Sequence, residues 1–349
     1  MRILKLNKSR YGLLSDGTKI HLFTISNGKM SVSVTDYGAI LTSIILPEKG
    51  GGNVDVLLGF STLDGFIHDD CSFGATVGRF ANRIGGASFT LDGVKYDLDK
   101  NDNGENMLHG GFDRWEKKAW KAKKVKTENG LGVKFSHISP DGEQKFPGTV
   151  KASVTYTLDE DNTLTIAYKA ETDKATPINL TNHAYFNLKG YAGGSVEDQE
   201  LQMFCSKYVE PSDKLIPTGK LIDVEGTPFD FKKPHLIGQD IAKTGMGYDH
   251  CYCIDGFTPE KKLNLTAIVK DPASGRKMVV KTTEPGVQLY TANFLNNVHG
   301  KNGFVYQKHG ALCLEAEAYP DSPNKSEFPS CILRPGETYR QITQYSFEF

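Results

Sequence analysis

Apolar and polar residues alternate with a period of two along much of this 349-residue chain. A clear example surrounds Asp92-Gly93. The alternating apolar positions there are Phe89 and Leu91 before the turn and Val94, Tyr96 and Leu98 after it. Asp-Gly between two such runs is a strong hairpin signal, because a type I′ turn needs positive φ at both central residues. The pattern predicts a β-hairpin over residues 89–98.

Longer hairpins are expected further along the chain. Alternating apolar residues occupy positions 152–158 and 164–170, on either side of a polar turn at Asp159–Thr163. A further pair of runs, at 263–269 and 278–280, flanks a turn at 271–275. Two further alternating runs begin at Met30 and at Tyr339, and the second continues to the end of the chain. Each of these runs predicts a strand with one buried face.

The pattern also indicates how the chain is organised. No stretch keeps apolar residues at helical spacing over three turns, no Pro/Ser-rich linker divides the chain, and no internal repeat is visible. Strands that recur about every ten residues are typical of all-β folds, which often extend beyond 200 residues as one unit. We therefore expect an all-β fold, a large antiparallel β-sandwich with few short helices, that forms one domain over residues 1–349.

Composition and charge exclude several classes of protein. The chain is 38% hydrophobic, and its 41 basic and 42 acidic residues give a net charge of −1. This balance argues against electrostatic binding to nucleic acid or anionic lipid, and no segment approaches the roughly 20 apolar residues of a membrane-spanning helix. No apolar stretch follows the basic residues near the N-terminus, so we expect no secretory signal and a cytoplasmic location.

The six cysteines do not indicate a disulfide framework in a chain of this length. His250 next to Cys251 and Cys253 offers at most three metal ligands, and no second cluster lies at zinc-site spacing. We expect buried, reduced thiols and no metal site. Phosphate-binding Gly-Lys-Ser/Thr loops and Gly-x-Ser-x-Gly motifs are also absent, which argues against nucleotide-dependent and serine-hydrolase chemistry.

Two carboxylates stand out in the apolar run at 311–319. Alternation places Glu315 and Glu317 on one strand face together with Cys313. Side chains two apart along a strand are about 6.5–7 Å apart, so the two carboxylates would be neighbours. Such a pair indicates either a solvated edge face or a functional site, and the sequence leaves both open.

Four other segments combine polar residues with glycine or aromatic residues. They contain His109 in Asn106–Gly111, His183 in Asn179–Asn187, Asp249 with His250, and Arg83 in Gly78–Ile84. Each histidine alone could be structural. Together the segments suggest a polar cleft with carboxylates, imidazoles, a guanidinium and aromatic walls, which suits a sugar.

These segments and several others, taken in their order along the chain, resemble the aldose 1-epimerase (galactose mutarotase) family. The resemblance rests on Gly78–Ile84, Asn106–Gly111, Ser139–Glu143, Asn179–Leu188, Leu215–Gly219, Gly226–Asp230, Gly247–His250, Gln288–Phe294 and Cys313–Pro320. It extends from about Val34 to Tyr345. Each motif is short, but so many in one order are specific.

The resemblance implies a galactose mutarotase-like β-supersandwich and a reaction without metal or cofactor. That reaction interconverts the α and β anomers of free aldohexoses such as galactose and glucose, in hexose metabolism. Glu315 matches the general base of the family and His183 its general acid. Substrate contacts are implied for Arg83, His109, Asp249, Asn82 and Gln288. The expected partner is the free sugar, with no nucleic acid and no membrane, and the protein is expected to be a monomer or a weak homodimer.

Anomer exchange requires the anomeric hydroxyl to lose a proton while the ring oxygen gains one. An ionised Glu315 and a protonated His183 would supply these steps at neutral pH, since an ordinary histidine pKa is about 6.5. Tyr185 and Phe294 are candidates to stack on the sugar.

Four positions depart from the family pattern: Glu317 replaces the usual Gln, Cys251 a common Asn, and Arg114 and Trp115 the usual Gly and Phe or Leu. If Glu317 faces the cleft, we expect it to point away, pair with a cation or stay protonated. The departures leave the preferred sugar open.

Three other functions remain compatible with these residues. A glycosidase could use Glu315 with Glu317 or Asp249. A sugar-binding module would bind without catalysis. A hexose-phosphate epimerase would need a cationic phosphate clamp, for which Arg79 is the spare arginine near a motif.

Overall fold

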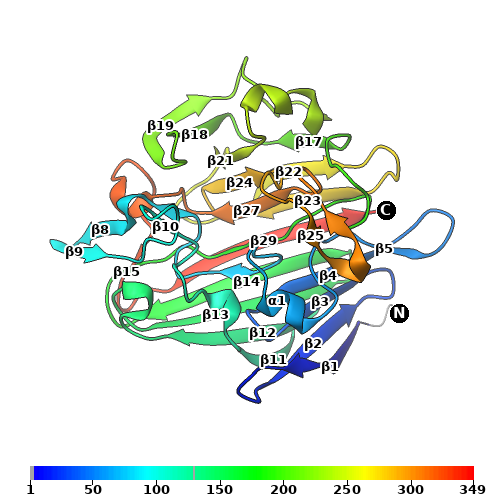
Figure 1. The fold of residues 1–349 in the computed structure, drawn as a ribbon, viewed down its shortest axis with the longest axis horizontal. Helices are drawn as coiled ribbons and strands as arrows, with labels where there is room; N and C mark the ends of the chain where they lie inside the picture. The colour runs from blue at the N-terminus through cyan, green and yellow to red at the C-terminus, as the bar shows by residue number, and fades with distance from the viewer. Residues whose placement is uncertain (1–3, 129) are drawn as a thin grey trace.

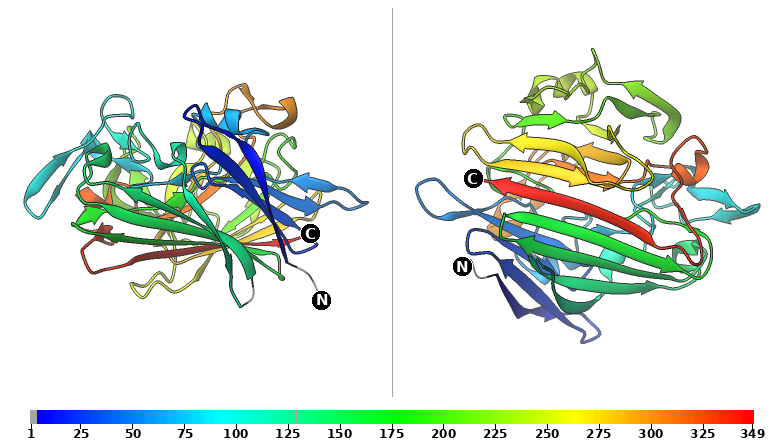
Figure 2. Two further views of the ribbon diagram at one scale, coloured as in Figure 1. Left: turned by 90° about the horizontal axis from the view of Figure 1, so that it is seen from below. Right: turned by 180° about the vertical axis from the view of Figure 1, so that it is seen from behind.

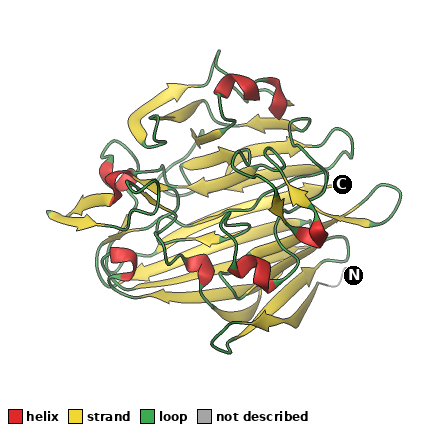
Figure 3. Ribbon diagram, in the orientation of Figure 1, coloured by secondary structure: helices red, strands yellow, loops and turns green. Residues whose placement is uncertain are grey.

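The computed structural model describes residues 4–128 and 130–349, and strands dominate it (Figure 3). The largest sheet has nine strands in the order β11-β12-β13-β14-β29-β23-β22-β17-β20. Their bounds are β11 Lys121–Lys126, β12 Gly130–Ser139, β13 Val150–Asp159, β14 Thr163–Thr172, β29 Tyr339–Glu348, β23 Lys277–Thr282, β22 Asn264–Lys270, β17 Glu200–Met203 and β20 His235–Leu236. Each pair of neighbours in this sheet is antiparallel.

Two five-stranded antiparallel sheets accompany the large one. The N-terminal sheet contains β1 Lys5–Leu13, β2 Lys19–Ser26, β3 Ser31–Thr35, β4 Leu41–Pro47 and β5 Asn53–Asp55. The other, which we call the cavity sheet, has the order β19 Pro217–Asp223, β18 Lys207–Pro211, β21 Asp249–Cys253, β24 Gly286–Tyr290 and β27 Cys313–Glu317.

Short pairs and turns complete the described chain. The pairs are β6 Thr76–Val77 with β16 Thr181–Asn182, β7 Arg83–Ile84 with β10 Met107–Leu108, β8 Ser88–Leu91 with β9 Val94–Asp97, β15 Thr176–Pro177 with β28 Ile332–Leu333, and β25 Val298–His299 with β26 Val305–Tyr306. The helices are α1 Leu63–Ile67 and 3₁₀ turns at Gly85–Ala87, Trp115–Lys117, Glu143–Lys145, Ile237–Gln239, Ile241–Thr244, Lys301–Gly303 and Ser322–Asn324. The prediction of an antiparallel all-β fold with few short helices is confirmed.

The sheets form two layers (Figures 1 and 2). Seen from behind, the nine-stranded sheet is the near layer, and both five-stranded sheets lie on its far side. The N-terminal sheet packs over β12, where the rings of Phe23 and Phe135 meet edge to face at 5.7 Å. The cavity sheet packs over β29, where the Tyr345 hydroxyl donates to the Leu314 carbonyl at 3.1 Å. A shared apolar core between the layers extends from Phe23 to Phe347.

The predicted hairpins exist, with local differences in burial. The hairpin predicted over residues 89–98 is formed by β8 and β9, which span residues 88–97, but Val94 is 52% exposed where alternation predicted burial. This hairpin projects from the edge of the molecule, so one of its strands has little to pack against (Figure 1). In β22 a register shift between Leu265 and Ala267 interrupts the alternation, and Leu263 is exposed. Within residues 4–128 and 130–349, none of the helices has the length and apolar character needed to cross a bilayer.

Candidate active site

The register of the cavity sheet gathers polar side chains on one face. Gln288 on β24 pairs with Cys251 on one side and with Glu315 on the other. Tyr290, two residues further along β24, pairs with Asp249 and with Cys313. Because residues two apart on a strand face the same side, these positions form two adjacent rows on one face.

A cavity of about 310 Å³ lies against this face. Its volume falls in the range of sites that bind small molecules. All of the predicted site residues line it, namely Asn82, Arg83, His109, His183, Asp249, Gln288 and Glu315. They come from β7 and the residue before it, the loops after β10 and β16, and three strands of the cavity sheet.

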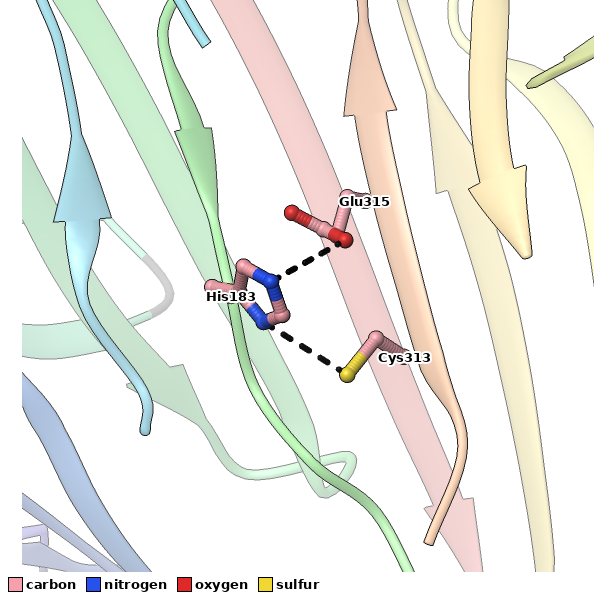
Figure 4. A group of neighbouring side chains, drawn as sticks. All are labelled: His183, Cys313 and Glu315. Atoms are coloured by element: carbon pink, nitrogen blue, oxygen red, sulfur yellow. Dashed lines mark hydrogen bonds and ion pairs between the residues drawn. The ribbon is translucent and has the colours of Figure 1, made fainter. Parts of the chain in front are cut away.

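His183 and Glu315 form the closest acid–base pair in this cavity (Figure 4). His183 Nε2 lies 3.5 Å from Glu315 Oε1, and His183 Nδ1 lies 3.6 Å from the sulfur of Cys313. The backbone of His183 is held on both sides, since its N–H donates to the Ala75 carbonyl and its carbonyl accepts from Gly74, each at 2.9 Å. The imidazole also stacks on Tyr185 with 4.9 Å between ring centroids. These contacts fix where the ring can reach.

Burial changes the protonation of the pair. It lowers the pKa of His183 to about 4 and raises the pKa of Glu315 well above its ordinary value. The nearby carboxylates of Glu317 and Asp249 raise the pKa of Glu315 further. Both shifts disfavour the charged forms. A single proton on the pair is therefore held more readily by Glu315 than by His183, the reverse of the distribution expected from ordinary pKa values.

His109 reaches the cavity from a strained backbone. Its φ is 52°, and Gly110 follows with φ 85°, where an added Cβ would lie 2.3 Å from the Gly78 carbonyl oxygen. The Asn82 backbone N–H donates to His109 Nδ1 at 3.2 Å. Nδ1 therefore carries no proton, and in the neutral ring the proton lies on Nε2. Burial, helped by His183 and Arg83, lowers the pKa of His109 well below 6.5 and keeps the ring neutral.

Two further pairs hold polar groups at the cavity wall. Arg83 Nε donates to Asp102 Oδ2 at 3.0 Å, and Gln288 Nε2 donates to Asp249 Oδ1 at 2.6 Å. Gln288 Oε1 is buried and has no hydrogen-bond partner among the described residues. Burial raises the pKa of Asp249, and the charge of Arg83 opposes this shift. The wall thus offers fixed donors and one unpaired acceptor.

Glu317 is separated from the cavity by Asn82. The Asn82 amide donates to Glu317 Oε1 at 3.0 Å, and its Oδ1 accepts from the Arg83 backbone N–H at 2.8 Å. Glu317 is 1% exposed, and burial together with Asp249 raises its pKa well above 4.5. The alternative of a solvated edge face is wrong, because all of β27 is buried. Glu317 does not line the cavity, and its raised pKa favours the protonated form.

Some cavity residues were not identified as candidates from sequence. Arg114 donates from Nη1 to Ser72 Oγ at 3.0 Å, and its Nε lies 3.2 Å from Glu116 Oε1. The Tyr290 ring lies nearly parallel to Phe294, with 6.1 Å between centroids. Alternation from Gln288 would have found Tyr290, but no local pattern indicated that Arg114 reaches the cavity. Tyr185 and Phe294 both line it.

The His250 cluster does not converge on a metal site. His250 lies on the opposite strand face from Cys251 and packs against Phe229 with 4.3 Å between ring centroids. Cys251 and Cys253 are free and buried, as expected. Arg79 is also buried, where its guanidinium donates to the Pro147 carbonyl at 2.8 Å, and it does not line the cavity.

Comparisons with known proteins agree with this geometry. The aldose 1-epimerase family model matches residues 21–346. The chain is 41% identical to the galactose mutarotase of Mus musculus over 348 residues, which is 99% of each chain. It is 36% identical to the aldose 1-epimerase of Escherichia coli (strain K12), with 96% of this chain and 97% of that one covered. The crystal structure of galactose 1-epimerase from Lactobacillus acidophilus NCFM is similar with a TM-score of 0.86 at 28% identity, covering 99% of both chains. The resemblance drawn from the sequence motifs is confirmed: the chain belongs to the aldose 1-epimerase family and is an isomerase.

Proposed function

We propose that this protein interconverts the α and β anomers of free aldohexoses such as galactose and glucose by opening and reclosing the sugar ring. Family membership supports the reaction at C1, and the names of the relatives support galactose. The single observation that carries the mechanism is the buried pair of His183 and Glu315, 3.5 Å apart at the wall of the cavity. Two groups this close together can hydrogen-bond to two oxygens of one pyranose, the anomeric hydroxyl and the ring oxygen.

In the proposed reaction Glu315 takes the proton of the anomeric hydroxyl while His183 gives a proton to the ring oxygen. The C1–O5 bond breaks, the C1–C2 bond of the open aldehyde rotates, and ring closure reverses both proton transfers. Because burial favours the proton on Glu315, it must first pass to His183 across the 3.5 Å gap. Sugar hydroxyls that hydrogen-bond Glu315 would favour its ionised form and so support this transfer.

The remaining wall would hold the ring. Arg83 and the Nε2–H of His109 are donors for ring hydroxyls, and Asp249 and the unpaired Gln288 Oε1 are acceptors. Positioned acid and base groups typically contribute about 10²–10⁴ each in rate, provided that the oxygens lie within hydrogen-bond reach. Holding the far hydroxyls while C1 rotates would therefore keep both groups aligned for closure.

We also propose that the protein acts in hexose metabolism in the cytoplasm. The free cysteines favour a reducing compartment. A monomer or weak homodimer remains the prediction for its assembly.

Polarimetry of freshly dissolved α-galactose and α-glucose tests the proposal. The rotation should relax to its equilibrium value at a rate proportional to protein concentration. A sugar-binding module would leave the rotation at its uncatalysed rate. A glycosidase would release phenol from an aryl galactoside, and a hexose-phosphate epimerase would act faster on the 6-phosphate than on the free sugar.

A further inference from the structure

We propose that His183, Cys313 and Glu315 also form an inhibitory site for a thiophilic divalent cation such as Zn²⁺. The three side chains are buried and each offers one ligand atom, and these atoms lie within 4.8 Å of one another (Figure 4). The cation would bind where the reducing end of the sugar is placed by the proposed mechanism. It would act against the reaction, not as a cofactor.

The spacing fits a small four-coordinate ion. At metal–ligand distances of about 2.0–2.3 Å, tetrahedral ligands are about 3.3–3.8 Å apart. The His183–Glu315 and His183–Cys313 distances are 3.5 and 3.6 Å. They involve different ring nitrogens, so a modest rotation of the imidazole or of the Glu315 carboxylate is needed to direct one nitrogen at the ion. Both partners on β27 are two residues apart on one strand face and hold a fixed spacing.

The donor set selects the kind of cation. A thiolate, an imidazole and a carboxylate suit Zn²⁺ and Cd²⁺, whereas Mg²⁺ and Ca²⁺ prefer oxygen ligands alone. Three protein ligands leave a fourth position on the cavity side for water, as in open zinc sites. Asp249 lines the same cavity and offers a further carboxyl oxygen close to the cluster, while the guanidinium groups of Arg83 and Arg114 also line it. Because the ligands must release protons to bind the cation, its affinity should increase with pH.

The thiol of Cys313 has no part in the proposed reaction, and its hydrogen-bond partner among the described residues is His183 Nδ1. A cation held by this thiol would occupy both the acid and the base at once. Binding of the cation does not depend on the proposed function, but the inhibition does, so the two must be measured separately.

The experiment uses metal-free protein and two measurements. Equilibrium dialysis counts bound Zn²⁺ directly, and polarimetry with α-galactose measures the rate at each Zn²⁺ concentration, relative to the metal-free rate of the same protein. We expect one Zn²⁺ per chain, inhibition that EDTA reverses, and no inhibition by Mg²⁺. Co²⁺ should give a thiolate-to-cobalt absorption band in the near ultraviolet.

The matched variants are Cys313→Ser and Cys251→Ser, since Cys251 is a buried thiol on the same sheet face but outside the cluster. Cys313→Ser should weaken Zn²⁺ binding by about tenfold or more and remove the cobalt band. Loss of a hydrogen-bond partner of a metal ligand already lowers affinity by about 10–100-fold, and loss of the ligand itself should cost at least as much. Cys251→Ser should change neither. Absence of stoichiometric Zn²⁺ binding, or equal binding by Cys313→Ser, would overturn the site. Zn²⁺ that binds through Cys313 without slowing the reaction would overturn the inhibition, and Cys313-dependent binding by a protein inactive on all sugars would leave the site standing and overturn the proposed function.

Discussion

The two five-stranded sheets pack on the same large sheet but bury different chemistry. Around the N-terminal sheet, Phe135 packs edge to face with Phe23 and with Tyr156, and the Tyr156 hydroxyl donates to the Ala39 carbonyl at 2.8 Å. Even the buried cation of Lys301 is fully satisfied there, by Asp55 Oδ2 at 2.6 Å and two backbone carbonyls. These contacts bury apolar groups and paired polar groups, which stabilises a fold.

The cavity sheet leaves its buried charges less well paired. The Glu315 carboxylate makes no hydrogen bond within residues 4–128 and 130–349, and its closest ion-pair contact is the 3.5 Å approach to His183 Nε2. Gln288 Oε1 is likewise buried and unpaired. Unpaired buried polar groups are costly to a fold, so two of them that line one cavity indicate groups kept for a ligand. The comparison indicates that the N-terminal half of the sandwich mainly stabilises the fold, whereas the cavity half holds the groups for catalysis.

Glu315→Gln should have the largest effect on activity. We expect the catalysed anomerisation of α-galactose to fall by about 10²–10⁴-fold, because an amide cannot accept the hydroxyl proton. The fold should persist, since removal of a buried carboxyl removes a desolvation cost. Polarimetry and thermal denaturation measure the two quantities. A variant as active as the wild type would show that Glu315 is not the base.

Phe135→Ala tests the other half of the comparison. Loss of this buried ring should lower the free energy of unfolding by about 3–5 kcal/mol, with the rate per folded molecule retained. Urea denaturation and polarimetry at low temperature give both values. A matched change at exposed Phe294, which lines the cavity, should instead affect the Michaelis constant with little change in stability. A stable Phe135→Ala protein with a damaged rate would contradict the division between the two halves.

The pH dependence of kcat/KM should reflect the shared proton on the acid–base pair. Because the pKa of His183 is lowered to about 4, the rate should stay level down to about pH 4 and fall below it, where both groups are protonated and the base is lost. On the alkaline side the rate should fall only above the raised pKa of Glu315, where the acid is lost. A pH series of polarimetric rates measures this. A fall in kcat/KM with an apparent pKa near 6.5 would instead show that His183 has an ordinary histidine pKa.

Glu317→Gln should have the smallest effect on rate, within about twofold, because Glu317 touches Asn82 and not the cavity. Its stability effect has a definite sign. Because the pKa of Glu317 is raised in the folded protein, the folded state binds this proton more tightly than the unfolded state does. The free energy of unfolding therefore falls as pH rises from the ordinary pKa of a glutamate towards the raised value. The Glu317→Gln variant has no such proton to lose, so its stability does not fall in this way. The difference between its melting temperature and that of the wild type should grow in favour of the variant as pH rises. Equal activity losses in Glu317→Gln and Glu315→Gln would mean that the wrong carboxylate has been assigned.

Much of the fold could be predicted because the period of two is a local property. The β13–β14 hairpin follows from alternating apolar residues and one polar turn, and its strands pair in register from Val150 with Thr172 to Leu158 with Leu164. Alternation failed where the surroundings decide burial, as at Val94, or next to a bulge that shifts the register, as at the half-buried Leu265.

The site was predictable only in part. Alternation placed Glu315 and Glu317 on one face, but it could not separate their roles, because the residue that holds Glu317 is Asn82, 235 positions away. The contact of Cys313 with His183 spans 130 positions. Such contacts depend on how β7, β16 and β27 are brought together in space, which no local pattern contains. The residue roles came from the family resemblance and remain predictions.

The central claim is that Glu315 and His183 act as one unit on one sugar. The anomerisation rate of the Glu315→Gln/His183→Asn double variant, compared with the two single variants, tests it most directly. Residues that act as a unit give strongly non-additive losses, so the double variant should be about as slow as the slower single variant. Losses that multiply in the double variant would show that the two side chains act independently, and would contradict the claim.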